Sequence, residues 1–270
     1  MTHISDMTSQ WISWITWFLA GAAIGSFLNV CIYRLPREQS VINPSRSYCP
    51  HCKHLIAWFN DIPLVSYLVL RARCRHCHKP IHWRYPVVEA ASGLLTVAVL
   101  QRFSDTPVVG FIYLIFVWGL LVSSFIDLEH QIIPDEISLG GLVVGLLAST
   151  AYPPLHGMSS PWQSLWYSAM GAVAGGGSIY LIGLLGNFIF RRESMGGGDV
   201  KLLAMVGSIL GWKLTLLAFF IAPFFGSVVG IILKVREGAE IIPYGPFLSL
   251  GSIVALLWGD RILVYLGFIR

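Results

Sequence analysis

The chain has 270 residues, of which 55% are hydrophobic and only 12% are charged, and its formal net charge is +4. Soluble domains carry about 25% charged residues, so this composition excludes a water-soluble exterior and indicates a surface that faces lipid. We attribute the small positive balance to membrane orientation and contact with anionic lipid, against the alternative of a solvated face without a partner, and expect no nucleic-acid partner.

Long uncharged runs predict transmembrane helices, since a bilayer core of about 30 Å needs roughly 20 apolar residues per helix. The first run is longer than a signal peptide requires and lacks a basic segment before it, so we expect a retained helix. The predicted fold is an all-α polytopic membrane protein with about eight transmembrane helices, of which 200–235 could be divided differently. They lie near 11–33, 86–102, 107–126, 137–152, 165–190, 200–212, 214–235 and 247–267.

The distribution of lysine and arginine predicts the orientation, because cytoplasmic segments are enriched in both. The segment 34–84 holds 9 of the 18 basic residues and is therefore expected in the cytoplasm. Eight helices then place fourteen basic residues inside and four outside. We expect three parts: a first transmembrane helix at 11–33, a cytoplasmic cysteine-rich domain at 34–85, and a transmembrane domain at 86–270.

Two C-x-x-C pairs in the basic segment predict a metal site. Cys49 and Cys52 form the first pair, and Cys74 and Cys77 form the second. Two such turns can present four thiolates to one tetrahedral ion, and a segment of about 50 residues with few core residues needs such a staple. A cytoplasmic location disfavours disulfides, so we predict structural zinc, with a redox pair as the chief alternative.

The remaining features of this segment support a zinc-ribbon-like domain. The motifs YCPHC at 48–52 and RCRHC at 73–77 look like zinc knuckles, and the turn at 58–64 could pack its aromatic side chains against the metal. Four thiolates already close a structural site, so we expect the nearby histidines not to be ligands: His51, His54, His76 and His78. Cys31 lies within the first helix and is expected to be an ordinary packed cysteine.

Two aspartates at predicted helix ends suggest a catalytic pair. Asp127 ends one helix, and Asp199 begins another after the glycines Gly196, Gly197 and Gly198. The expected topology places both at the cytoplasmic boundary. Two close carboxylates tend to share one proton, so one can activate water as a base while the other protonates a leaving amine. The glycines would let the backbone approach a substrate closely.

Structural explanations compete with this interpretation. Asp199 could simply cap the helix that follows, and Asp127 could be an ordinary interfacial acid, as we expect for Glu129, Asp135 and Glu136. Asp135 follows a proline and could N-cap the helix expected from residue 137. It is the strongest alternative for the first catalytic position.

Six segments in order resemble signatures of the type IV prepilin peptidases. They are GSFLNVCIYRLP at 25–36, the two cysteine pairs, RYPVVE at 84–89, IDLEHQIIPD at 126–135, GGGDVK at 196–201 and PYGPF at 243–247. The resemblance covers about residues 25–247. It places the two catalytic aspartates on Asp127 and Asp199, the second within the G-x-G-D motif.

The resemblance implies an activity, a substrate and a methyl donor. Members of this family remove the short basic leader of type IV prepilins and type II secretion pseudopilins at the cytoplasmic side of the bacterial inner membrane. Members with the cysteine domain also methylate the new N-terminal residue with S-adenosylmethionine. No nucleotide-binding loop is recognisable for that step, and its site residues are unassigned. Glu89 is a candidate, although an acid near a helix start is also favoured structurally.

Two other functions are compatible with parts of the pattern. Another G-x-G-D intramembrane protease would pair the motif with a Tyr-Asp sequence, whereas Asp127 here follows Ile126, and would lack the cysteine domain. A membrane transporter could use carboxylates at helix ends to bind ions, but it would be expected to contain inverted repeats, which the sequence does not show.

Overall fold

The computed structural model describes residues 2–43, 47–57, 61–190, 195–237 and 243–268. Its contacts divide the chain into two compact units, Met1–Trp118 and Gly119–Arg270, which are described separately below. The boundary falls within helix α4 (Pro107–His130), so the first half of that helix belongs to one unit and its end to the other.

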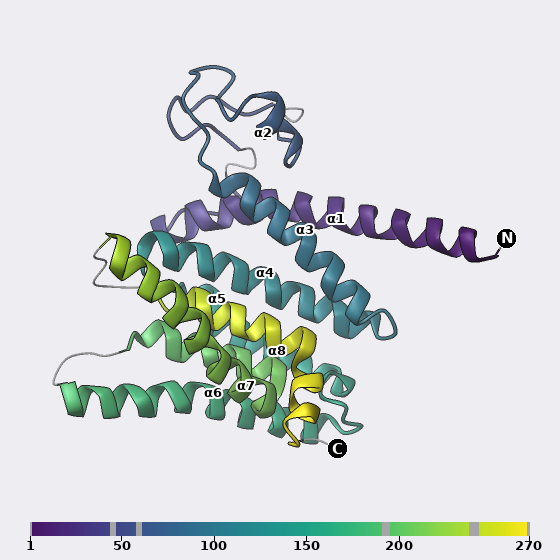
Figure 1. Ribbon diagram of the computed structural model, residues 1–270, viewed down its shortest axis with the longest axis vertical. Coiled ribbons are helices and arrows are strands. Elements are labelled where there is room, and N and C mark those ends of the chain that lie inside the picture. The colour runs from purple at the N-terminus through teal and green to yellow at the C-terminus, as the bar shows by residue number, and fades with distance from the viewer. Residues whose placement is uncertain (1, 44–46, 58–60, 191–194, 238–242, 269–270) are drawn as a thin grey trace. The chain divides into compact units, whose positions relative to one another are not determined.

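In the first unit, α1 (Thr2–Arg34) packs closely against α3 (Arg84–Arg102), as the ribbon shows (Figure 1). A Cβ atom on Gly25 would lie 2.7 Å from the Cα of Glu89, so only glycine permits this approach. The Ser92 hydroxyl donates to the carbonyl of Gly21 at 2.7 Å. Small residues at such crossings are common in membrane helices because they allow the backbones to pack closely.

The cysteine-rich segment between these helices contains little regular structure. The short helix η1 (Leu35–Arg37) follows α1, and α2 (Val65–Val69) is the other helix of the segment among the described residues. Two isolated β-bridges, Tyr48 with Leu55 and Arg73 with Pro80, close one turn around each cysteine pair. The two turns therefore hold the four cysteines, while α2 lies between them in the sequence.

The second unit contains the end of α4 and the helices that follow it. These are α5 (Asp135–Ala151), η3 (Pro153–His156), α6 (Pro161–Phe190), α7 (Gly197–Glu237) and α8 (Gly245–Tyr265). Helices α6 and α7 pack with their backbones in contact where Gly171 meets Gly207. Fully buried side chains of α7 and α8, among them Leu203, Val206 and Leu248, form the interior.

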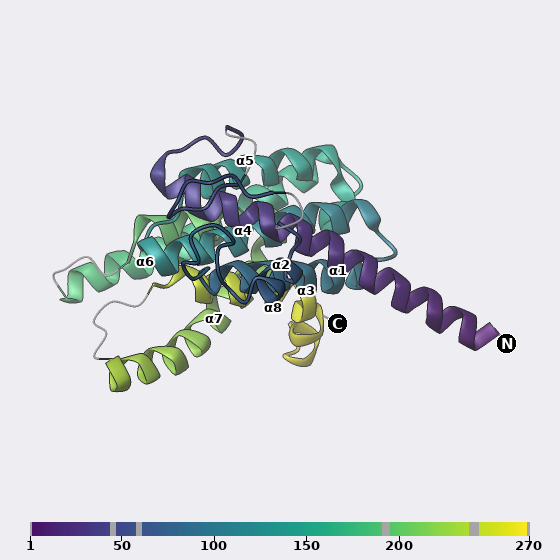
Figure 2. The ribbon, with the colours of Figure 1, turned by 90° about the horizontal axis from the view of Figure 1, so that it is seen from above.

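Helix α7 turns back on itself at Gly211, whose φ of 75° and ψ of 168° are not helical. Gly175 of α6 contacts both Leu203 and Thr215, which a straight helix would separate by about 18 Å. Figure 1 shows α7 in two segments that run in different directions, and Figure 2 shows its yellow-green segment from above. The predicted division of 200–235 into two helices is thus confirmed, with the break two residues before the expected position at 213.

The helices agree with the predicted runs, but the number of spans does not follow from them. Among the described residues, 5 helices are long and apolar enough to cross a membrane, and they include the first run at Gln10–Arg37. Helix α5 has only 17 residues, α3 is not among the five, and the two segments of α7 count as one. The all-helical, multi-pass membrane fold is confirmed, whereas eight spans are not.

Candidate active site and metal centre

Asp127 occupies the last turn of α4, which extends to His130 and so beyond the predicted end at residue 126. Its side chain is buried, with 6% of the residue exposed. One carboxylate oxygen, Oδ2, accepts a hydrogen bond of 2.9 Å from the backbone N–H of Gly245, the first residue of α8. This bond joins two segments that are 118 residues apart in the sequence and fixes the direction of the carboxylate.

Asp199 lies in the first turn of α7, where the helix begins at Gly197. Its carboxylate accepts a hydrogen bond from the backbone N–H of Gly196, and the charge of Asp127 acts on it. Asp199 is the third residue of the helix, so this contact resembles the backward bond of a capping box. The capping interaction expected as an alternative is therefore present in a modified form, and the same carboxylate lies within electrostatic reach of Asp127.

Ile133 packs between the starts of α7 and α8 and leaves no room for a side chain at two glycine positions. A Cβ atom on Gly198 would lie 3.1 Å from the Cβ of Ile133, and one on Gly245 would lie 3.2 Å from its Cδ1. The loop after Asp127 thus occupies the space that side chains at these positions would need. The three helix ends that carry Asp127, Asp199 and Gly245 consequently meet around one isoleucine.

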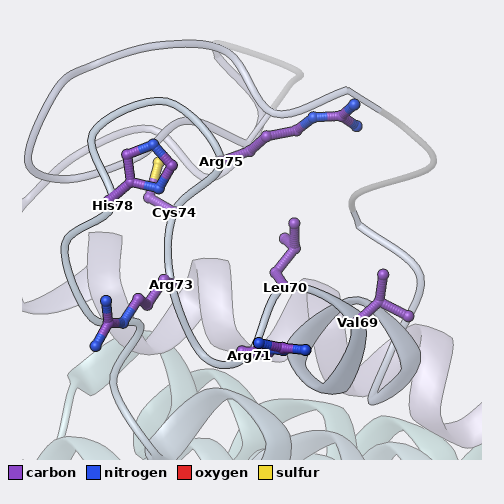
Figure 3. Close-up of a pocket in the computed structure, with 7 residues that line it drawn as sticks. All are labelled: Val69, Leu70, Arg71, Arg73, Cys74, Arg75 and His78. Carbon is purple, nitrogen blue, oxygen red and sulfur yellow. The ribbon is translucent and has the colours of Figure 1, made fainter.

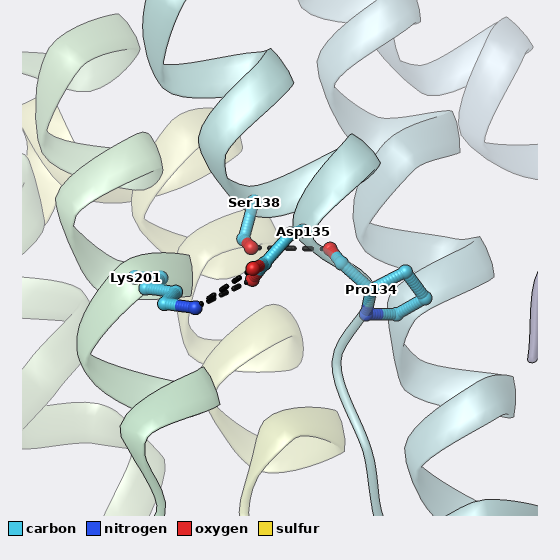
Figure 4. A network of polar contacts seen from close by, with 4 residues as sticks. All are labelled: Pro134, Asp135, Ser138 and Lys201. Carbon is cyan, nitrogen blue, oxygen red and sulfur yellow. Dashed lines mark hydrogen bonds and ion pairs between the residues drawn. The ribbon is translucent and has the colours of Figure 1, made fainter.

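Asp135, the alternative for the first catalytic position, forms an ion pair instead. Its two carboxylate oxygens lie 2.7 and 2.9 Å from Nζ of Lys201, which is two residues after Asp199 (Figure 4). The predicted N-cap role is wrong, because α5 begins at Asp135 itself and Pro134 occupies the cap position. A proline fits there because it needs no hydrogen-bond partner for a backbone N–H. The pair ties the start of α5 to the start of α7.

Tyr244, just before α8, is a residue of this region for which the sequence predicted no role. Burial, followed by the nearby charge of Asp199, raises the pKa of Tyr244 to about 12. The phenol therefore stays protonated near neutral pH and can donate a hydrogen bond. Both Tyr244 and Gly245 lie in the PYGPF motif. Its resemblance to a family signature was the one sequence feature that pointed to these residues. The sequence does not indicate that the backbone of this motif contacts Asp127.

The four cysteines predicted as ligands converge in the first unit. The sulfur atoms of Cys49, Cys52, Cys74 and Cys77 all lie within 4.8 Å of one another. The Sγ atoms of Cys49 and Cys77 are 3.9 Å apart, and a tetrahedral zinc ion with bonds of about 2.3 Å would separate its sulfur ligands by about 3.8 Å. The donor set and its spacing thus fit one zinc ion.

The two cysteine turns repeat the same hydrogen bonds. Cys49 N–H donates to the carbonyl of His54, and Lys53 N–H donates to that of Cys49, each at 2.9 Å. Cys74 makes the two corresponding bonds with Lys79 and His78, also at 2.9 Å. In both turns the residue after the second cysteine has a positive φ, 58° at Lys53 and 56° at His78. These are the two knuckles that the spacing predicts.

The electrostatics of the second turn favour a thiolate at Cys74 but not at Cys77, whose pKa is raised to about 11: the backbone N–H of Lys79 lowers it, but desolvation and the other cysteine thiols raise it more. A hydrogen bond from the backbone N–H of Cys77 lowers the pKa of Cys74 to about 7, with further bonds from neighbouring groups. The rings of His54 and His76 contact each other at 3.5 Å between centroids, with their planes tilted by 41°, and join the two turns. Of the aromatic turn expected against the metal, residues 58–60 lie outside the described part of the chain.

Glu89 makes a structural contact that the sequence did not predict. It is 8% exposed, and its Oε2 accepts a hydrogen bond of 2.8 Å from the backbone N–H of Leu64, just before α2. This bond attaches the cysteine-rich segment to α3 and gives Glu89 a structural contact, but the expected position at a helix start is wrong, because α3 begins at Arg84 and has no acid in its first turn. Cys31 lies in α1 as a free, half-buried thiol.

The structure thus defines a class: multi-pass helical membrane proteins with a carboxylate pair at converging helix ends and a cluster of four cysteines that could hold a metal ion. The chain matches the family model of the bacterial peptidase A24 N-terminal domain over residues 19–103. It also matches the model of the type IV leader peptidase family over residues 114–231.

Curated relatives agree with both models, and each is called "Prepilin leader peptidase/N-methyltransferase". The protein from Stutzerimonas stutzeri is 36% identical over the full length of both chains. That from Pseudomonas aeruginosa is 37% identical over 90% of each chain. That from Myxococcus xanthus is 41% identical over 82% of this chain, which spans 63% of the relative's length. No solved structure matches the chain.

The chain belongs to the type IV leader peptidase family. The resemblance seen in the ordered motifs is confirmed, and the match extends across both units.

Proposed function

We propose that the protein is a membrane aspartic peptidase that removes the leader peptide of type IV prepilins and of type II secretion pseudopilins. The observation that carries this proposal is the convergence of Asp127 and Asp199 at the ends of two helices, beside the backbone N–H of Gly245. Family membership and the names of the relatives support the substrate class.

The chemistry follows from two carboxyl groups that share a proton. The ionised group takes a proton from water as the water oxygen attacks the carbonyl carbon of the scissile peptide. The protonated group gives its proton to the amide nitrogen, and the carbon–nitrogen bond breaks. A carboxylic acid and an amine result, and the two groups have exchanged roles. The N–H of Gly245 orients Asp127 throughout, which limits reorganisation at the reacting centre.

We further propose the placement expected from the sequence. The protein would lie in the bacterial inner membrane with about eight spans, and the cysteine domain and both aspartates would face the cytoplasm. The basic residues concentrated in 34–84 support this orientation. We keep the division into a first span at 11–33, a cytoplasmic cysteine domain at 34–85 and a transmembrane peptidase domain at 86–270.

A second activity, N-methylation of the new N-terminal residue, is supported by the names of the relatives. S-adenosylmethionine would supply the methyl group. The described residues show no glycine-rich cradle that fits this donor, so we assign none of them to it.

We propose that Cys49, Cys52, Cys74 and Cys77 hold a structural zinc ion that staples the cysteine domain. Mass spectrometry of the purified protein in native buffer should find one zinc ion per chain, and Cys49→Ser should lose it. Methylation or stability should fall in this variant before peptide hydrolysis does. Absence of bound metal, or equal loss of both activities at normal protein levels, would contradict this assignment.

The decisive experiment measures leader removal from a prepilin by membranes that contain each variant. Asp127→Asn and Asp199→Asn should each reduce cleavage by about 10²–10⁴-fold, the usual contribution of an acid–base group. Asp135→Asn is the matched control, because it makes the same change outside the proposed pair. If Asp127→Asn cleaved normally and Asp135→Asn did not, the first catalytic position would be Asp135. Wild-type membranes that leave prepilin intact would favour another protease or a transporter.

A further inference from the structure

A basic hollow in the first unit lies beside the four cysteines, one of which, Cys74, lines it. It has a volume of about 570 Å³ and lies between the end of α2 and the second cysteine turn (Figure 3). The residues that line it carry three guanidinium groups and one imidazole but no carboxylate. They are Val69, Leu70, Arg71, Arg73, Cys74, Arg75 and His78.

The backbone distributes the three arginines around this hollow. Arg71 and Ala72 have φ angles of 49° and 57°, an unfavourable region for residues other than glycine, and they reverse the chain after α2. Arg73 then enters the β-bridge with Pro80. Figure 3 shows the side chains of Arg73 and Arg75 pointing away from each other, so they do not converge on one small anion.

Helix α2 adds an apolar edge to the same surface. Leu68 and Val69 at its end are 74% and 75% exposed. The N–H of Leu64 before α2 is bonded to Glu89 of α3, which packs against Gly25 of α1. Gly25 lies nine residues before Arg34, about 13 Å along the helix. Helix α2 is therefore attached to α3 beside the C-terminal half of α1, a helix long and apolar enough to cross a membrane.

We propose that this surface binds the headgroups of anionic phospholipids, with Leu68 and Val69 inserted among the acyl chains. Guanidinium groups bind phosphate oxygens in a bidentate manner. Arginines spread around an open hollow suit a layer that carries many phosphates. Exposed leucine and valine beside them suit the apolar boundary of the same layer. The inference rests on the proposed cytoplasmic placement of this segment and does not involve the two aspartates.

The test uses the full-length protein in a neutral detergent and counts bound lipids by native mass spectrometry during titration with phosphatidylglycerol or phosphatidylcholine. The wild type should retain phosphatidylglycerol preferentially. Each arginine near an anionic surface contributes about fivefold to binding, so Arg71→Gln with Arg73→Gln should weaken retention roughly 25-fold. Lys53→Gln with Lys79→Gln, which removes equal charge outside the hollow, should change it much less.

Three results would overturn the proposal. They are equal retention of both lipids, equal losses in the two double variants, and displacement of phosphatidylglycerol by inorganic phosphate at constant ionic strength. The last would indicate a site for a small anion. A second variant, Leu68→Ser with Val69→Ser, should also reduce retention, which separates a lipid surface from simple charge attraction. Leader cleavage measured on the same samples shows whether the peptidase proposal fails independently.

Discussion

Gly245 offers the sharpest test of the proposed site, because its effect on Asp127 can be derived from distances. In Gly245→Ala the new Cβ atom would lie 2.7 Å from Oδ2 of Asp127, whereas ordinary contacts begin at 3.4 Å. The carboxylate or the start of α8 must therefore move by about 0.7 Å. The same atom would crowd Ile133 at 3.2 Å, which limits the directions in which the strain can relax.

A displacement of about 1 Å in a reacting group can cost about 10²-fold in rate, equivalent to about 2.7 kcal/mol of transition-state stabilisation. We expect Gly245→Ala to lower kcat/KM for prepilin cleavage by about this factor. The assay uses purified full-length protein and follows leader loss at equal enzyme concentration. Gly140→Ala in α5 is the control, because a Cβ atom at that position would have no neighbour within 4 Å. Cleavage by Gly245→Ala within about threefold of wild type would refute the reasoning.

Three further predictions concern other contacts. Gly198→Ala should lose at least about tenfold in cleavage, because its new Cβ atom would lie 3.1 Å from the Cβ of Ile133. Gly197→Ala is the control, because its Cβ atom would face open space, and it should cleave normally. Equal cleavage by the two variants would contradict this packing. Lys201→Met should cost at most about 1 kcal/mol of unfolding free energy, since its ion pair with Asp135 is 40% and 56% exposed; a much larger loss in denaturant titration would argue against a surface pair. Burial lowers the pKa of His156 from 6.5 to about 4. Between these pH values the unfolded chain binds more protons than the folded one, so the melting temperature should fall as the pH drops from 6.5 to 4. If the melting temperature of His156→Gln fell equally, His156 would be excluded as the cause.

Local sequence determines those parts of the structure that could be predicted. Hydrophobic runs indicated the helices, because burial of apolar side chains in lipid decides where they form. The cysteine pairs indicated the four-cysteine cluster, because each C-x-x-C turn is a local unit whose backbone bonds place its two sulfurs. Only the pairing of the two turns required long-range structure. The pairing of the two turns was expected because a segment with few core residues needs a staple.

The contacts around Asp127 could not be predicted in the same way. Its bond to Gly245 spans 118 residues, and no periodicity relates the two positions. The role of Asp135 was misjudged because an aspartate after a proline fits an N-cap, whereas Pro134 itself occupies that position and frees the carboxylate for Lys201. The number of spans stays a prediction, because runs of apolar residues do not distinguish a crossing helix from a shorter one such as α5.

The positions of the aspartates bear on the choice of the cleaved bond. Asp127 lies in the last turn of α4 and Asp199 in the first turn of α7, so both carboxylates lie near the ends of apolar helices and not at their centres. A peptide bond can reach them only where a substrate leaves the bilayer, because an extended backbone inside the hydrocarbon core would lose its hydrogen bonds. A polar leader followed by an apolar stem places its junction at this depth. Leader removal at that junction is therefore the reaction that the geometry of the helix ends favours.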